Sequence, residues 1–333
     1  MEANHMKIVR YDRYGAPEKV LSLTDEAAPQ PQPNEAIVRV EAAPVHIADL
    51  KCINGEPNFR MFPLPAVPGF EGIGRIARVG TEVTAFAEGD RVFLPMACGA
   101  WREEIAVNAA DLMPAPEGDA VQLSLLPINP PTSYLMLNDY GDLKPGDWLI
   151  QNAANSSCGV YLVKLAKMRG VKTVNVVRRE SLAPALIEEG ADIVLVDGPD
   201  LADRVREATG NADIKLAIDA VAGDATTRLG ECLSDGGTVL CYGMLSGEPC
   251  KLPPDMVFLR DIRLRGFYTV RQFAEHKPED IAKMYSDLAG MVADGTLRAR
   301  IAGTFSLDDA AAGCALAAKV GDDRPGKVII TMT

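Results

Sequence analysis

The sequence lacks several features that would assign it at once to a class of protein. No apolar run reaches the about 18 residues that a helix needs to cross a bilayer, and no basic stretch precedes an apolar core near its start. Lysine and arginine number 34 against 46 aspartates and glutamates, a net charge of −12. We therefore expect no membrane and no nucleic-acid partner, although a local basic pocket on such a protein can still bind a small anion.

Disulfide and metal patterns are missing as well. The seven cysteines are scattered, and none forms a CxxC pair. An odd number of cysteines in a long chain argues against a disulfide framework and favours a reducing compartment, so we expect a cytoplasmic protein. The three histidines are His5, His46 and His276, the last in a segment typical of a surface loop. Residues 1–5 are interpreted as an extension, because a second methionine follows them just before a strand-like run.

A chain of 333 residues is long for one core, and its texture changes twice. Over residues 1–125, short strands are separated by proline and glycine. Val38 and Val40 alternate there with Arg39 and Glu41, as in a half-buried strand. This part is predicted to be an irregular, β-rich domain.

Strands and helices alternate over residues 126–267. The predicted strands are 147–152, 172–177, 192–196, 214–219, 237–242 and 261–267, and the predicted helices are 159–169, 182–189, 201–208 and 224–233. Continuous apolar strands between amphipathic helices indicate a parallel sheet covered on both faces, which is a doubly wound Rossmann domain. Residues 268–333, with a helix at 278–294, are predicted to return to the first domain. The fold class is α/β, with the Rossmann domain inserted into the β-rich domain.

The strand at 147–152 leads into a turn of small residues that suits a dinucleotide. Such a turn lets backbone N–H groups reach a pyrophosphate at a helix N-terminus. The GxGxxG pattern is broken, because Ser157 stands where a glycine is usual before Gly159. The turn alone fits equally well an ordinary helix start capped by Asn155 or Ser156.

The next strand indicates which nucleotide would bind. It ends at Val177 and runs directly into Arg178 and Arg179. An acidic residue about 20 positions after the glycines would bind the ribose 2′-hydroxyl of NAD, whereas arginine can fork onto the 2′-phosphate of NADP. The pair therefore favours NADPH; the alternative is a solvated basic pair at a strand end.

Several segments, taken in chain order, carry a family resemblance. They are Leu-Pro-Ala-Val at 64–67, Gly-Ala-Trp-Arg at 99–102, Asn-Pro-Pro-Thr-Ser-Tyr at 129–134, Gln-Asn-Ala-Ala-Asn-Ser at 151–156, Asn-Val-Val-Arg at 175–178, Tyr-Gly at 242–243 and Leu-Arg-Gly-Phe at 264–267. The chain resembles zinc-independent medium-chain dehydrogenases/reductases, in particular mitochondrial-type trans-2-enoyl thioester reductases, and also quinone oxidoreductases. The resemblance implies a GroES-like catalytic domain, a cleft between the domains, and a homodimer joined through edge strands, to which residues 256–259 could contribute.

The resemblance also implies which residues contact NADPH. These are Asn129, Asn155, Ser156, Ser157, Cys158, Gly159, Arg178, Arg179, Tyr242, Gly243, Met244, Leu245, Phe267, Tyr268, Thr269 and Lys327. It further implies that the three catalytic zinc ligands of zinc-dependent relatives correspond to His46, Phe70 and Asn129. One possible ligand is too few for Zn²⁺, which takes about three protein ligands, so we expect no metal.

The catalytic residues are less well marked. Reductases of this type are expected to carry a tyrosine that polarises the thioester carbonyl, but residues 54–63 contain none, and Phe59 cannot donate a hydrogen bond. His46 stands where relatives have an asparagine facing the nicotinamide, and it could protonate an enolate carbon or hold a carbonyl. Asn129 and Tyr268 are further candidates. The alternatives are a packed His46 without a role and a Tyr268 that only packs on the cofactor.

Three functions stay open for a small-molecule substrate. The first is NADPH-dependent reduction of a 2-enoyl thioester, by hydride transfer to the β-carbon. The second is reduction of a quinone or of an α,β-unsaturated ketone or aldehyde, which the missing tyrosine favours. The third is a non-catalytic NADPH-binding protein with a sensing or structural role. Trp101 and Arg102 either shape a substrate mouth or hold the fold, and Arg60 meets either an anionic tail or solvent.

Overall fold

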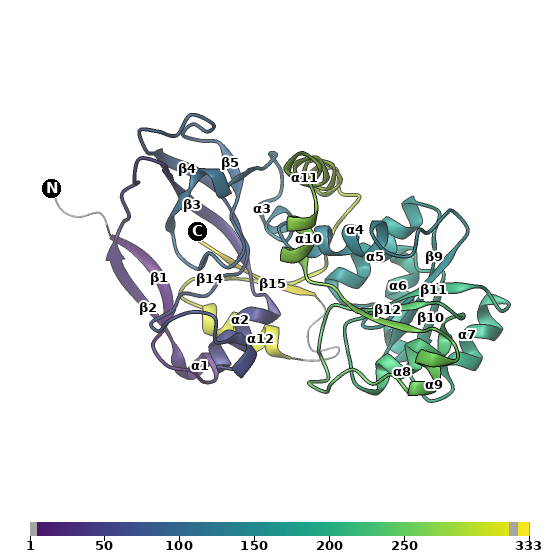
Figure 1. Cartoon of the computed structure of the whole chain (residues 1–333). Helices are drawn as coiled ribbons and strands as arrows, with labels where there is room; N and C mark the ends of the chain where they lie inside the picture. The colour runs from purple at the N-terminus through teal and green to yellow at the C-terminus, as the bar shows by residue number, and fades with distance from the viewer. Residues whose placement is uncertain (1–4, 320–325, 333) are drawn as a thin grey trace. The chain divides into compact units, whose positions relative to one another are not determined.

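The computed structural model describes residues 5–319 and 326–332. The chain divides into two compact units, one made of Met1–Ile128 with Ala282–Thr333 and the other of Asn129–Ile281 (Figure 1). The first unit is β-rich and the second holds a parallel sheet with helices on it, so the predicted α/β fold class is confirmed.

The first unit is built on one large sheet and a hairpin. The sheet has the strand order β14-β15-β3-β4-β5-β7, with β6 also paired to β3. Its strands are β3 (Glu35–Pro44), β4 (Ile73–Val79), β5 (Arg91–Phe93), β6 (Glu104–Asn108), β7 (Met113–Pro114), β14 (Ile301–Ser306) and β15 (Lys327–Thr331). The C-terminal strand β15 runs antiparallel beside β3, as Figure 1 shows, so the end of the chain returns to the first unit. The hairpin joins β1 (His5–Tyr11) to β2 (Leu21–Ala27), and it begins two residues earlier than the predicted strand-like run.

Short helices interrupt this β-rich unit. They are α1 (Pro17–Val20), α2 (Ile47–Asn54), α3 (Ala120–Leu123) and α12 (Ala310–Ala318), with single 3₁₀ turns η1 (Pro57–Phe59) and η2 (Ala109–Asp111). The long helix α11 (Pro278–Ala293) leads back from the second unit. Helix α2 starts with a capping box, in which the His46 side chain accepts from the backbone and the Asp49 carboxylate accepts from the His46 N–H. This cap fixes His46 at the start of a helix.

The second unit has the strand order β10-β9-β8-β11-β12-β13, with all neighbours parallel. The strands are β8 (Trp148–Gln151), β9 (Lys172–Val177), β10 (Ile193–Val196), β11 (Ile214–Asp219), β12 (Thr238–Cys241) and β13 (Arg263–Gly266). The helices are α4 (Asn129–Asn138), α5 (Ser157–Met168), α6 (Ala183–Glu189), α7 (Leu201–Thr209), α8 (Asp224–Cys232), α9 (Pro254–Phe258) and α10 (Thr269–Glu275), with a 3₁₀ turn η3 (Glu180–Leu182) before α6. Because the chain order reverses between β8 and β11, the carboxyl ends of these strands form the crevice in which open α/β sheets bind ligands.

The second unit extends further along the chain than the predicted range 126–267. The Thr269 hydroxyl of α10 lies 2.9 Å from the Thr132 hydroxyl of α4. His276 Nε2 lies 3.3 Å from the Asp139 carboxylate, and its Nδ1 lies 2.8 Å from the Gln272 carbonyl oxygen. These side-chain contacts hold α10 on α4, and strand and helix periodicity gives no sign of them. His276 is thus a partnered residue of this unit and not a solvated loop residue.

Candidate functional site

The turn between β8 and α5 shows why the glycine pattern is imperfect. Ser157 is the first residue of α5 and therefore has a helical backbone, so a glycine is not required there. Ser156 is the N-cap, and its hydroxyl accepts a hydrogen bond from the Gly159 N–H at 3.1 Å. A Cβ on Gly159 would lie 2.5 Å from the Ala154 carbonyl oxygen. Gly159 is therefore needed for the close approach of helix and turn, and Ser157 is compatible with a dinucleotide turn.

A buried amide network holds this turn against the neighbouring strand. Gln151, at the end of β8, donates through Nε2 to the Gly159 carbonyl oxygen at 3.0 Å and to Asn175 Oδ1 at 2.7 Å. Asn175, in β9, donates in turn to the Thr173 hydroxyl at 2.8 Å. Both amides are buried, and buried polar groups are stable only when they are hydrogen-bonded. The network fixes the helix α5 start relative to β8 and β9.

Asp219 is a second anchor, which was not among the predicted site residues. It ends β11 and is fully buried. Its carboxylate accepts four hydrogen bonds at 2.6–3.0 Å, from Asn152 Nδ2, the Val221 and Ala222 N–H groups and the Thr226 hydroxyl. The ends of β8 and β11 are thereby tied together where the strand order reverses. The only visible signal is an acidic residue closing an otherwise apolar strand.

The two arginines predicted to select NADPH lie at the carboxyl end of β9. Arg178 and Arg179 both follow the last strand residue, Val177, and both side chains are exposed. This is the same edge of the sheet as the turn after β8, because the two strands are parallel neighbours. Both arginines therefore follow a strand at the carboxyl edge of the sheet, which carries the turn, and their contact with a phosphate stays a prediction.

The loop after β12 carries four of the predicted cofactor contacts. Its start passes closely over the loop after β11: a Cβ on Gly243 would lie 2.6 Å from the Ala220 carbonyl oxygen, and the Leu245 N–H donates to that same oxygen at 3.1 Å. Burial next to Cys158 raises the pKa of Tyr242 well above its usual value. Met244 and Leu245 remain 41% and 57% exposed, so they form an apolar surface beside the turn.

Helix α4 begins at the predicted residue Asn129 and contacts a second predicted residue, Cys158. Asn129 is 8% exposed, and its Nδ2 has no hydrogen-bond partner among the described residues. Ser133, one turn later, donates to the Cys158 carbonyl oxygen at 2.8 Å and lies 3.1 Å from its sulfur. Helix α4 is thus joined to the cofactor turn, and it presents a buried amide donor that a ligand could satisfy.

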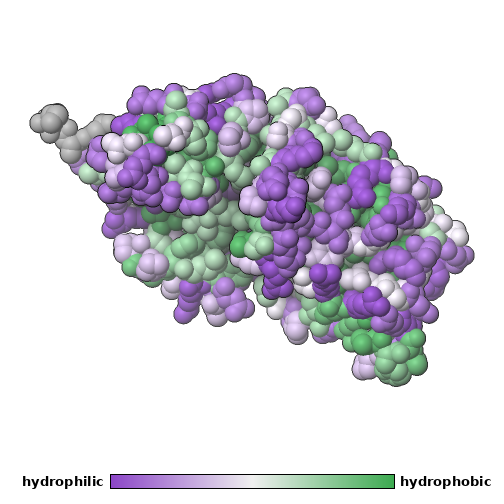
Figure 2. Space-filling model, turned by 45° about the horizontal axis from the view of Figure 1, so that its top comes forward, coloured by the Kyte–Doolittle hydropathy of each residue, from purple (hydrophilic) through white to green (hydrophobic). Residues whose placement is uncertain are grey.

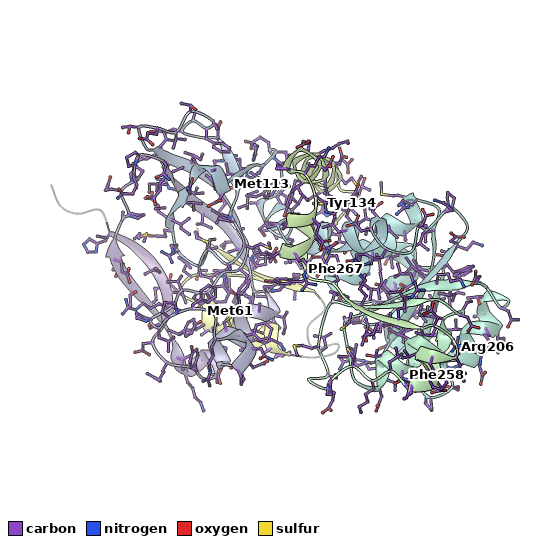
Figure 3. The ribbon with its side chains drawn as sticks, viewed as in Figure 1. Met61, Met113, Tyr134, Arg206, Phe258 and Phe267 are labelled. Carbon is purple, nitrogen blue, oxygen red and sulfur yellow. The ribbon has the colours of Figure 1, made fainter. Side chains whose placement is uncertain are left out.

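The residues after β13 divide into a packed and an exposed part. Phe267, labelled in Figure 3, is 7% exposed and packs edge-on against the Tyr140 ring at 6.0 Å. Tyr268 is 57% exposed, and no interaction of its hydroxyl fixes its role. Thr269 is held by its hydrogen bond to Thr132. Phe267 thus packs within the unit, and its predicted contact with the cofactor, like the roles of Tyr268, stays a prediction.

His46 and Lys327 are the predicted residues that lie in the first unit. The His46 Nδ1 accepts a hydrogen bond from the Ala48 N–H at 3.2 Å, so the ring proton of neutral His46 is on Nε2. Although the ring keeps partial exposure, burial lowers its pKa to about 3, and the charge of Lys327 acts in the same direction. The Phe70 ring stacks on His46 at 6.0 Å. His46 is therefore a neutral Nε2–H donor around pH 7.

Two buried carboxyl groups lie in the same unit as His46, and one of them contacts it. Asp49 accepts from the His46 N–H and from the Gly69 N–H, each at 2.8 Å, and burial raises its pKa to about 7. Glu71 is fully buried, and burial raises its pKa to about 8 against the attraction of Lys327. Asp49 is one of the residues that line a small pocket. The lining residues are Tyr11, Asp49, Cys52, Phe62, Val67, Pro68, Gly69, Phe70, Ala97 and Gly99. Asp49 and Glu71 were not among the predicted site residues.

Three further residues of this unit, Trp101, Arg102 and Arg60, had two interpretations each from the sequence. Trp101 is fully buried in the core. Arg102 donates to the Gly99 carbonyl oxygen at 2.8 Å, and burial lowers its pKa. The Arg60 guanidinium lies 5.0 Å from the centre of the Tyr14 ring. Trp101 and Arg102 therefore hold the fold. Arg60 remains exposed, so whether it meets an anionic tail or solvent stays open.

A Rossmann unit and a β-rich unit in one chain define a medium-chain dehydrogenase, and two family models agree. The alcohol dehydrogenase GroES-like domain matches residues 32–117, and the zinc-binding dehydrogenase family matches residues 158–289. Phe70, which stands at one of the three positions expected for zinc ligands, has no atom that can bind Zn²⁺. The absence of a metal stays a prediction.

Curated relatives narrow the class. The mitochondrial enoyl-[acyl-carrier-protein] reductase of Rattus norvegicus is 32% identical over 306 residues, covering 90% of this chain and 82% of the relative. That of Caenorhabditis elegans is 35% identical over 300 residues, covering 86% of this chain and 85% of the relative. The chain belongs to the mitochondrial-type enoyl thioester reductase family and is an oxidoreductase, as the sequence resemblance implied.

Solved structures agree on the fold. A putative NADPH:quinone reductase from Bacillus thuringiensis superposes with a TM-score of 0.91 at 26% identity, covering 99% of this chain and all of that one. The mitochondrial 2-enoyl thioester reductase heterodimer from Candida tropicalis gives a TM-score of 0.85 at 25% identity, covering 98% of this chain and 100% of that chain.

Proposed function

We propose that the protein reduces the C=C bond of a 2-enoyl thioester with NADPH. Hydride adds to the β-carbon, the electron pair of the double bond moves toward the carbonyl, and the resulting enolate takes a proton at its α-carbon. The observation that carries this proposal is the fixed Nε2–H tautomer of His46, a hydrogen-bond donor in the unit from which the expected tyrosine is missing. Membership of the enoyl thioester reductase family supports the same reaction.

NADPH is supported by the second unit alone. The turn at Ser156 and Gly159 exposes the N-terminus of α5, which favours a pyrophosphate. Arg178 and Arg179 then provide the positive charge for a 2′-phosphate. The unpartnered Asn129 Nδ2 is a donor suited to a carboxamide such as that of nicotinamide.

The role of His46 follows from its electrostatics. A ring whose pKa is lowered to about 3 stays neutral during turnover and is not a ready acid. It can still donate a hydrogen bond from Nε2 to the carbonyl oxygen on which negative charge develops, and one such donor contributes on the order of 3 kcal/mol to the transition state. Of the two roles expected for His46, the structure favours holding the carbonyl, so the proton for the α-carbon comes from another donor or from water.

The test compares three substrate classes. NADPH oxidation is followed with crotonyl-CoA, with a quinone and with an α,β-unsaturated ketone under the same conditions. Enoyl thioester reduction requires the highest kcat/KM with crotonyl-CoA. Activity confined to the quinone or the ketone would contradict it, and NADPH binding without any turnover would favour a sensing or structural protein.

Reduction of a quinone is the second candidate function. The putative NADPH:quinone reductase from Bacillus thuringiensis has a TM-score of 0.91, and residues 54–63 lack the tyrosine expected of enoyl reductases. A donor to the carbonyl is less necessary for a quinone, because the electron-poor ring accepts hydride more readily. His46→Ala would then have little effect on quinone turnover.

We also propose that the protein is a homodimer joined through the second unit. Strand β13 is the edge of the sheet, and its residues Arg263–Gly266 are exposed. Beside it, Val257, Phe258 and Leu259 are 48%, 72% and 71% exposed. Figure 2 shows hydrophobic residues gathered at the end of this unit where α9 lies, and Figure 3 labels Phe258 there. Such an edge and apolar patch are typical of an interface.

Light scattering after size-exclusion chromatography tests the dimer. The wild type is expected at the mass of two chains and Phe258→Asp at the mass of one, because the carboxylate would be buried in the interface. A wild type at the mass of one chain would contradict the proposal.

No helix among the described residues has the length and apolar character to cross a membrane. A cytoplasmic location stays a prediction.

A further inference from the structure

Two cysteines meet beside the loop that carries the predicted cofactor contacts. Cys241 is the last residue of β12, and Cys250 follows the exposed loop 242–249. Their sulfur atoms lie 3.5 Å apart, and both side chains are half-buried. The Cys241 thiol also donates to the Gly243 carbonyl oxygen at 3.2 Å, so its sulfur is held next to the loop. A disulfide requires an S–S distance of about 2.05 Å, so a small shift would join them.

The loop closed by these two residues is part of the proposed cofactor site. Its first half is tied to the loop after β11, since the Leu245 N–H donates to the Ala220 carbonyl oxygen at 3.1 Å and the Ser246 N–H to the Val221 carbonyl oxygen at 2.9 Å. Among the described residues, its second half forms hydrogen bonds within the loop, from the Gly247 N–H to the Met244 carbonyl oxygen at 3.1 Å and from the Glu248 N–H to the Ser246 hydroxyl at 3.1 Å. A covalent link at Cys250 would therefore restrain the half that is otherwise exposed.

A metal is a less suitable occupant of this corner. The Asp219 carboxylate lies with both sulfurs in a group whose ligand atoms are within 4.8 Å of one another. That carboxylate already accepts four hydrogen bonds, which tie the end of β11 to Asn152 after β8, to the loop after β11 and to α8. A metal would have to displace some of them, whereas a bond between the two sulfurs leaves them in place.

We propose that Cys241 and Cys250 are a modification site that forms a reversible disulfide and so weakens dinucleotide binding. The oxidant is a small-molecule disulfide of the glutathione type. One protein thiolate attacks it, forming a mixed disulfide and releasing one small thiol; the second protein thiolate then displaces the other. Two protein thiols lose two electrons, the small disulfide gains them, and the two protons end on the released thiols.

The order of the two steps follows from the surroundings. Burial and the neighbouring Cys250 raise the pKa of the Cys241 thiol. Cys241 is therefore the poorer first nucleophile, and Cys250 is the sulfur that meets the oxidant. The effect on binding rests on the proposed NADPH site, because Tyr242, Gly243, Met244 and Leu245 must fit around the dinucleotide and the link removes freedom from their loop.

The experiment treats the full-length protein with oxidised glutathione, blocks the remaining thiols and maps the peptides by mass spectrometry. A peptide pair joined through Cys241 and Cys250, lost again on treatment with dithiothreitol, is expected. Failure to find this pair when other cysteines have reacted would overturn the proposal without touching the proposed function. Stoichiometric zinc in the purified protein that is lost in Cys250→Ser would overturn it too.

NADPH titration of the reduced and oxidised forms measures the consequence. The oxidised wild type is expected to bind on the order of tenfold more weakly, with recovery after reduction. Cys250→Ser should bind as the reduced wild type does and ignore the oxidant, whereas the control Cys98→Ser, changed in the other unit, should stay sensitive. Equal or tighter binding by the cross-linked protein would refute the effect on the cofactor. If neither form binds NADPH, the proposed function fails while the peptide map still decides the disulfide.

Discussion

The two units place their buried polar groups in different ways. In the Rossmann unit, three buried side chains at the strand ends are hydrogen-bonded: Asp219 accepts four bonds, and Gln151 pairs with Asn175. The buried Asn129 Nδ2, which has no partner among the described residues, is the exception there. In the β-rich unit, His46 and Glu71 are desolvated groups whose pKa values move away from their usual ones, down to about 3 and up to about 8.

This difference separates binding from chemistry. Satisfied amides and a satisfied carboxylate make a rigid frame, which suits the recognition of a large cofactor. Shifted pKa values indicate groups whose charge state is controlled by their surroundings, and such groups gather at catalytic sites. Substitution of His46 should therefore change turnover, and substitutions of Asp219 and Arg178 should change stability or cofactor affinity.

The largest expected effect is on turnover. His46→Ala should lower kcat with crotonyl-CoA by about 100-fold, the loss typical of one removed oxyanion donor, and leave the Kd for NADPH unchanged. His46→Asn is the matched control, because an asparagine amide can still donate, and it should recover part of the loss. An unchanged kcat in His46→Ala would remove this residue from the mechanism.

The next effect is on the stability of the protein, through the buried anchor of the second unit. Asp219→Asn should lower the free energy of unfolding by about 3 kcal/mol, since an amide cannot accept from all four donors that the carboxylate now satisfies. Denaturant titration measures this. Asp224→Asn, which changes an exposed aspartate of α8, should leave the midpoint nearly unchanged. Equal shifts in both variants would show that Asp219 is no anchor.

The third effect depends on pH. Burial raises the folded-state pKa of Glu71 from 4.5 to about 8, so its stabilising protonated form is fully present below pH 4.5 and is lost as the pH rises through 8. Between pH 6 and 8 the wild type should lose on the order of 2 kcal/mol of unfolding free energy relative to Glu71→Gln.

Glu117→Gln is the control for this pH dependence. The Arg75 side chain lowers the pKa of Glu117, so its charge does not change between pH 6 and 8. Its stability relative to the wild type should therefore stay constant over that range. A constant difference for Glu71→Gln as well would mean that Glu71 is ionised throughout.

The smallest expected effect is on cofactor choice. Arg178→Ala should weaken NADPH binding about tenfold, which corresponds to about 1.4 kcal/mol, and change NADH binding little. Arg206→Ala, on the exposed face of α7 and labelled in Figure 3, is the matched control and should change neither. Equal losses for NADPH and NADH in Arg178→Ala would sink the assignment to the 2′-phosphate.

The sequence was most informative where burial is continuous. The bounds of β9 and β11 agree with the predicted strands, because each is a mostly apolar run that ends at polar residues. Helix α12 was missed, since Ala310–Ala318 is almost entirely small residues and shows no polar face. Helix α2 was missed because its start depends on a capping box involving a histidine, which is not a usual N-cap residue.

The candidate site likewise has parts that could be predicted from the sequence and parts that could not. The turn, the arginine pair and the position of His46 could be predicted, since they follow from strand ends and from resemblance. The partners of Asp219 could not, because they come from three separate segments of the chain. The tautomer of His46 also could not, since it depends on the direction of one backbone N–H group, that of Ala48.

The state of the His46 ring is the central claim, and nitrogen-15 NMR of the histidine rings measures it directly. His46→Asn identifies the signal among the three histidines. The ring of His46 is expected to stay neutral from pH 8 down to pH 5, with its proton on Nε2 throughout. A ring that gains a second proton near pH 6.5, or that carries its proton on Nδ1, would contradict the proposal that His46 is a neutral donor to the substrate carbonyl.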